Sequence, residues 1–94
     1  MWVWSGDLDV ADVAALTTTW RALLEDRPAS VVIDLTGVTF VDCAVLSVLV
    51  RANGDPSTRL LLRGVPARVD EVLRLTGLGA AFDRAAAPAP PRAA

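Results

Sequence analysis

The chain has 94 residues, 53% of them hydrophobic, and a formal net charge of -2. This composition excludes a disordered chain, and the length allows one small domain built around a single core. The basic residues are all arginine and are scattered along the chain, so no basic patch for binding nucleic acid is indicated.

The first half of the chain predicts a strand, a helix and a second strand. Residues 2–4 ("WVW") have strand composition, and "SGDLD" after them is typical of a turn. Apolar residues then recur with helical spacing and predict a helix over residues 12–26, with Asp9 or Asp12 as its N-cap. The segment "SVVIDLT" is almost continuously apolar, which indicates a strand buried on both faces of a sheet. Its one charged residue, Asp34, is expected to be hydrogen-bonded at the strand end.

The second half predicts a further helix, strand and helix. The segment "TGVTFV" is expected to turn the chain, and Asp42 is the expected N-cap of a helix "CAVLSVLVRA" that ends at Asn53 and Gly54. The segment "RLLLR" predicts the next strand. Because a helix joins them, the two strands should be parallel with a right-handed crossover. Pro66 and Gly77 lie where a third helix would start and end.

These elements predict an α/β domain with a small, mostly parallel sheet. Residues 85–94 are rich in alanine and proline and lack residues suited to packing, so we expect a disordered tail there. Residues 1–84 then form a single domain.

The residue types that usually carry catalysis are scarce. The sequence has no histidine, lysine or tyrosine, and no spacing commits two of its acidic residues to one site. It also has no Gly-rich phosphate loop and no cluster of metal-ligand residues. We therefore expect a protein that is not an enzyme and has no cofactor or metal.

The sequence also predicts the compartment of the protein. A single cysteine cannot form an internal disulfide, and the N-terminus lacks the basic and apolar regions of a signal peptide. The longest apolar runs are far shorter than a membrane span requires. We expect a cytoplasmic protein without direct membrane insertion. The exclusive use of arginine and the many alanines are typical of a GC-rich bacterial genome.

The start of the central helix is the most informative feature. A helix N-terminus presents unpaired N–H groups and the positive end of the helix dipole, which favours a phosphate on a hydroxyl residue placed there. In this chain Cys43 and Ala44 occupy these positions, so a hydroxyl is absent. Asp42 acts as an N-cap alone or contacts a partner in addition.

Other residues allow two interpretations. Cys43 is either a small buried residue or a redox-reactive thiol activated by the helix dipole. Ser47 is either a displaced phosphorylation site or a residue that bonds back to the preceding helical turn. Trp2 and Trp4 belong either to the core or to an exposed binding patch, whereas the helical spacing places Trp20 in the core.

Three segments, in order, resemble the signatures of STAS domains, the anti-sigma factor antagonist fold shared with the tails of sulfate transporters. They are "GDLDV", "VVIDLTGVTFVDCAVLSVLVRA" and "RLLLRGVPARVDEVLRLTGLGAAF", and the resemblance covers residues 3–83. It implies a small sheet with helices packed largely on one side.

The resemblance extends to the phosphorylation motif of the family. In phosphoregulated members, an Asp-Ser-Ser/Thr-Gly type motif starts the central helix, and phosphate on its second hydroxyl residue breaks the complex with the partner. Asp42 matches the Asp of this motif, while Cys43, Ala44 and Val45 depart from it. Since Ala44 replaces the phosphoacceptor, the switch is expected to be absent.

The resemblance also implies where a partner binds. Asp9, in "GDLD", matches a position that contacts anti-sigma partners. The expected partner-binding surface consists of Asp9, Asp42, Cys43, Ala44, Val45 and Leu46.

The resemblance implies a non-enzymatic protein-binding module that regulates transcription. It would act like an anti-sigma factor antagonist and bind a kinase-type anti-sigma factor without the phosphorylation switch. The alternative is an adaptor subunit on the ATPase of a bacterial lipid-transport ABC complex. Family members usually have a further strand before "WVWSGDLD" and a last helix after "GLGAAF", so we also expect an open sheet edge that supports a homodimer.

Overall fold

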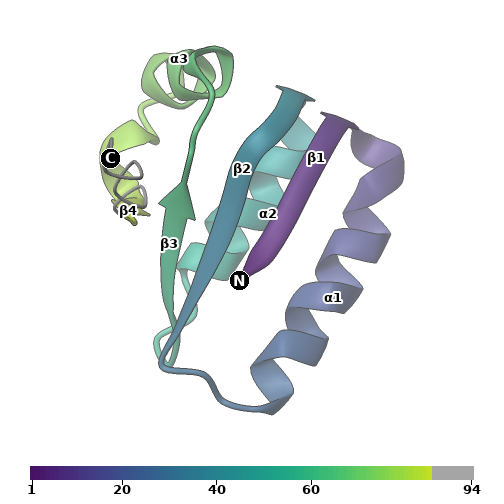
Figure 1. The fold of residues 1–94 in the computed structure, drawn as a ribbon, viewed down its shortest axis with the longest axis vertical. Coiled ribbons are helices and arrows are strands. Elements are labelled where there is room, and N and C mark those ends of the chain that lie inside the picture. Colours follow the sequence, from purple (N-terminus) through teal and green to yellow (C-terminus); the bar gives the residue numbers. More distant parts are fainter. Residues whose placement is uncertain (86–94) are drawn as a thin grey trace, which may run out of the picture.

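Four parallel strands form one sheet, in the order β1-β2-β3-β4, in the computed structural model, which describes residues 1–85 (Figure 1). The strands are β1 (Trp2–Leu8), β2 (Ser30–Val41), β3 (Arg59–Arg63) and β4 (Asp83–Arg84). The helices are α1 (Val13–Glu25), α2 (Cys43–Asn53) and α3 (Ala67–Leu75), with short 3-10 segments η1 (Val10–Asp12) and η2 (Gly79–Ala81). No helix within residues 1–85 is long and apolar enough to cross a membrane. The predicted α/β class with a parallel sheet is confirmed, whereas β4 was not expected.

The core lies on one face of the sheet. In β2, Ile33 and Leu35 are fully buried, while the alternate residues Val32 and Asp34 are half-buried. The same alternation occurs in β3, and Figure 1 shows α2 behind β1 and β2. The prediction that β2 is buried on both faces is therefore wrong. A continuous apolar sequence does not exclude a half-open strand, because valine suits a pleated surface even when it is partly exposed.

Both β1 and β2 are longer than predicted. β1 continues through Leu8 and β2 through Val41, so the two segments expected to turn the chain are strand. They pair with each other, with register shifts on either side of Ser5 and Gly6. Gly6 adopts a φ of 76°, and a Cβ on Gly37 would lie 3.3 Å from the Cβ of Ser5. The glycines thus allow irregular pairing where local composition predicts a turn.

The start of α1 uses both predicted capping residues. The Asp9 carboxylate accepts a hydrogen bond from the Ala11 N–H, and the Asp12 carboxylate accepts one from the Asp9 N–H, each at 2.9 Å. This reciprocal capping box initiates η1, and α1 follows from Val13. The helix predicted over residues 12–26 is confirmed with a 3-10 lead-in.

The end of α3 is a Schellman motif. Gly77 has a φ of 74°. Its N–H donates to the carbonyl of Arg74 at 3.1 Å, and the Leu78 N–H donates to the carbonyl of Leu73 at 2.8 Å. The predicted left-handed cap at Gly77 is confirmed. Gly54 also ends α2 as predicted, but in a right-handed conformation.

The three tryptophans form one cluster. Trp4 and Trp20 are buried and Trp2 is half-buried. The Trp2 ring stacks on Trp20 at 6.3 Å between centroids and meets Trp4 edge to face at 5.1 Å. Trp20 is a core residue as predicted, and Trp2 and Trp4 also pack inward rather than forming an exposed patch.

The predicted tail of residues 85–94 lies almost entirely outside the described residues. Its first residue, Ala85, is half-buried, and its N–H donates to the carbonyl of Leu62 at 2.8 Å.

Candidate protein-docking surface

Asp42 anchors the start of α2 to the end of the sheet. Its carboxylate accepts a hydrogen bond from the Val45 N–H at 3.1 Å, as expected for an N-cap. Its own N–H donates to the carbonyl of Leu8 at 3.2 Å, which ties the helix start to the end of β1. The predicted N-cap is confirmed, and the first turn of α2 has a defined position relative to β1 and β2.

The first turn of α2 divides into an exposed and a buried half. Cys43 is exposed and Ala44 is half-buried, whereas Val45 and Leu46 are buried. The interpretation of Cys43 as a small buried residue is therefore wrong. Val45 lies in the core with no exposed surface, so its packing stabilises the first turn of α2.

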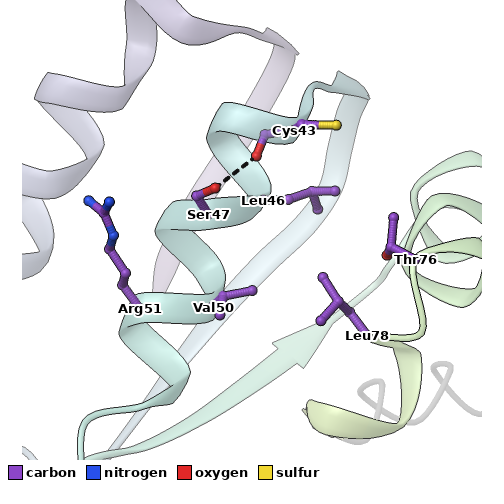
Figure 2. A pocket seen from close by; sticks show the side chains of 7 residues that line it. All are labelled: Cys43, Leu46, Ser47, Val50, Arg51, Thr76 and Leu78. Atoms are coloured by element: carbon purple, nitrogen blue, oxygen red, sulfur yellow. Dashed lines mark hydrogen bonds between the residues drawn. The ribbon is translucent and has the colours of Figure 1, made fainter.

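The outer face of α2 carries a strip of exposed side chains. Cys43, Ser47, Val50 and Arg51 are exposed and recur at intervals of three or four residues, which places them on one side of the helix. The Ser47 hydroxyl donates to the Cys43 carbonyl at 3.1 Å (Figure 2). This confirms the back-bonding interpretation of Ser47. We call these four residues the α2 strip.

A groove of about 340 Å³ runs between α2 and the turn after α3. Figure 2 shows Leu46 and Val50 of α2 pointing toward Thr76 and Leu78 across this groove, while Arg51 points away from it. The groove is lined by Cys43, Leu46, Ser47, Val50, Arg51, Thr76 and Leu78. The Schellman motif places Leu78 in this position because the left-handed Gly77 reverses the chain beside α2.

Both side-chain hydroxyls in the groove are already hydrogen-bonded to helical backbone. The Thr76 hydroxyl donates to the carbonyl of Val72 at 2.8 Å, as the Ser47 hydroxyl does to that of Cys43. Hydroxyls paired in this way add little polarity to the surface. The groove is therefore mainly apolar, and it suits an apolar side chain of a partner.

Acidic residues lie at the end of the sheet from which α2 starts. Leu8 and Val41 are paired in the parallel register, so Asp9 and Asp42 follow neighbouring strand ends. Asp7 lies nearby on β1 and accepts a hydrogen bond from the Thr39 hydroxyl. No ion pair among residues 1–85 involves any of these carboxylates. The structure thus places the predicted residues Asp9 and Asp42 at the same end of the sheet and gives this end negative charge.

Two other carboxyls have lowered pKa values but do not line the groove. Hydrogen bonds from the side chain and backbone of Thr36 hold the pKa of Asp34 below its ordinary value. Hydrogen bonds from Ser57 lower the pKa of Asp55 in the same way. The hydrogen bond from Thr36 confirms a structural role for Asp34, but Asp34 lies within β2 and not at the strand end as expected. Within residues 1–85, no group of acidic or cysteine side chains could hold a metal ion.

Sequence reasoning missed the far wall of the groove. Helical spacing alone could have predicted that Val50 and Arg51 share a face with Cys43, since they follow it by about two turns. For Leu78 the sequence provides only an indirect indication of packing. An apolar residue often follows the glycine of a Schellman motif and packs against the helix. Its position across from α2 depends on how α3 packs.

The comparison with known families agrees with this architecture. The family model described as "Mlab, STAS domain" matches residues 4–83, which include all four strands except the last residue of β4 and the first two residues of β1. No curated protein matches the chain. Because the family model covers most of the sequence, this chain belongs to the STAS domain family.

Proposed function

We propose that this STAS protein is a non-enzymatic docking module that binds a partner protein through the α2 strip, the adjoining groove and the Asp9–Asp42 end. One observation carries the proposal. An exposed helix face borders an apolar groove at a helix start that has no hydroxyl group. Exposed apolar surface of this kind is typical of protein interaction sites. The acidic rim would complement basic residues on the partner.

The first candidate partner is a kinase-type anti-sigma factor. The position of the helix start within the STAS motif supports this choice, and Ala44 stands where phosphoregulated members accept phosphate. A methyl group cannot accept a phosphoryl group. The protein would therefore act as a constitutive antagonist that stays bound regardless of ATP.

The test measures binding of a purified kinase-type anti-sigma factor to wild type and to Ala44→Asp. Asp at the second position of α2 suits the helix dipole, so the variant should fold. We expect at least a tenfold weaker complex for Ala44→Asp, because charge is introduced into the docking surface. The matched control is Ala22→Asp, which places the same charge on an exposed position of α1 and should bind like wild type.

Phosphorylation provides a second readout. After incubation with the anti-sigma factor and ATP, intact mass should show no added phosphate on wild type. Phosphate on the first turns of α2 would contradict the absence of a switch. Equal binding by Ala44→Asp and wild type would contradict the docking surface itself.

The second candidate partner is the ATPase of a bacterial lipid-transport complex. Two observations favour it: the helix start has no acceptor hydroxyl, and the description of the matched family names Mlab rather than an anti-sigma factor antagonist. An adaptor needs a docking surface but no phosphorylation site. Co-expression with such an ATPase and with a kinase-type anti-sigma factor, followed by co-purification, distinguishes the two partners.

A further inference from the structure

A second cavity lies beside the first turns of α3. It has a volume of about 150 Å³ and is bounded by the end of β2 and by α3. Its lining consists of Thr39, Phe40, Val41, Arg68, Val69 and Val72, and we call it the β2–α3 pocket. Within residues 1–85 it shares no lining residue with the groove, and it involves neither β1 nor the first residues of the chain. The pocket is therefore a separate site.

The size of the β2–α3 pocket fits a single side chain. Pockets that bind small molecules usually have volumes of about 300–1,000 Å³. An apolar cavity of about 150 Å³ instead holds one aromatic ring. Aromatic side chains seated in pockets commonly anchor the interfaces between proteins. The volume thus favours an anchor residue of a partner protein over a free small molecule.

The walls of the pocket are mainly apolar. Phe40 is 49% exposed, although it is a large aromatic residue near the end of β2. Val41 and Val69 are buried, and Val72 is half-buried. The hydroxyl of Thr39 already donates a hydrogen bond to Asp7. An incoming aromatic ring can therefore pack on Phe40 and cover apolar surface that is now in water.

Arg68 gives the rim of the pocket a positive charge. Its side chain is exposed, and it forms no ion pair with any residue of the range 1–85. The carboxylate of Asp70, two residues further along α3, is paired with Arg84 at 2.9 Å. Asp7 lies on β1, on the side of β2 away from β3 (Figure 1). Arg68 is thus available to a carboxylate of a partner.

We propose that the β2–α3 pocket receives an aromatic side chain of a partner protein, and that Arg68 pairs with an Asp or Glu beside that aromatic residue. The cavity sets the size of the anchor, and Arg68 sets the sign of the charge next to it. Asp9 and Asp42 require the opposite charge, so a partner that carries both signs is held in one orientation. The inference goes beyond the proposed function, because it adds a binding site outside the α2 strip and the groove.

Nuclear magnetic resonance of the isotope-labelled full chain tests the pocket with short peptides. The probe is acetyl-Glu-Trp-Glu-amide, and the control peptides replace Trp by Ala or both Glu residues by Lys. We expect saturable shifts of the backbone amides of residues 39–41 and 68–72, with a dissociation constant of about 1 mM. Both control peptides should bind at least fivefold more weakly. The net charge of -2 would favour the lysine peptide, so a preference for the glutamate peptide reports on Arg68.

Variants test the two parts of the pocket separately. Arg68→Glu should bind the probe at least fivefold more weakly, because repulsion replaces an ion pair. Its control is Arg21→Glu, which makes the same charge change at an exposed position of α1 and should bind like wild type. Phe40→Ala should weaken binding about fivefold. Its control is Leu75→Ala, since Leu75 is 75% exposed on α3 and does not line the pocket.

Circular dichroism establishes that each variant is folded, and Glu in the first turn of α3 is favoured by the helix dipole. The absence of saturable shifts at the pocket would overturn the inference, as would shifts confined to the groove beside α2. So would equal binding of the alanine peptide, or equal affinity of Arg68→Glu and wild type. Each of these results leaves the proposed function standing, because its own test uses Ala44 and a purified partner.

Discussion

The backbone N–H of Leu78 donates to the carbonyl of Leu73 across Gly77, and this contact places the Leu78 side chain on the wall of the groove beside α2. The same bond ends α3 and shapes the proposed docking surface. A capping motif that is local in sequence therefore contributes to a site formed by two separate helices.

Substitution of Gly77 should destabilise the protein. Gly77→Ala forces an alanine into the left-handed region at a φ of 74°, although a Cβ there would meet no atom within 4 Å. We expect a loss of about 1 kcal/mol in the free energy of unfolding, measured by urea denaturation. The control is Gly54→Ala, since Gly54 ends α2 at a φ of −79° and should tolerate alanine. Equal effects of the two changes would show that the left-handed cap is unimportant.

Gly64→Ala should be more damaging than Gly77→Ala. Gly64 has a φ of 63°, and a Cβ there would clash with the hydroxyl oxygen of Thr36. We expect a loss of about 3 kcal/mol, because overpacking adds to the backbone strain. A double-mutant cycle with Thr36→Ala, measured by urea denaturation, should recover part of this loss. Strict additivity of the two changes would contradict the clash.

The capping role of Asp42 and its proposed contact with a partner can be separated by substitution. Asp42→Ala removes the cap on α2 and should cost about 1 kcal/mol in stability, measured by thermal and urea denaturation. Asp42→Asn retains a side-chain oxygen for the Val45 N–H and should keep most of this stability. If the charge contacts a partner, Asp42→Asn should weaken binding while folding is unchanged. Equal destabilisation by both variants would contradict the capping role.

Stability should decrease in acid through Asp34 and Asp55. Hydrogen bonds lower the folded-state pKa of both carboxyls below 3.8, so each stabilises the folded state above that value. This contribution is lost as the pH falls below about 4 and through the folded pKa. Urea denaturation at pH 7 and pH 3 should therefore show a smaller pH-dependent loss for Asp34→Asn than for wild type. An identical loss would exclude Asp34 as a contributor.

Much of the helix and strand structure could be predicted because its signals are local. The carboxylate of Asp42 caps a backbone N–H three residues away, and Gly77 closes α3 within a few residues. The composition of "RLLLR" predicts β3 with its observed bounds. In the candidate site, the absence of a hydroxyl at Ala44 is a property of the sequence alone. These features depend on neighbours along the chain, so periodicity and residue type reveal them.

The lengths of β1 and β2, the burial of β2 and the groove could not be predicted from the sequence. Each of these features depends on contacts between residues far apart in the chain. The segments expected to be turns are strand because Gly6 and Gly37 allow irregular pairing that continues to Leu8 of β1 and Val41 of β2. Half-burial of Val32 followed from helices covering one face of the sheet. The groove exists because α3 packs where Leu78 faces α2. The sequence by itself thus determined the family, the helix caps and the absence of a hydroxyl at Ala44, whereas long-range packing decided which side chains are exposed and which line the groove.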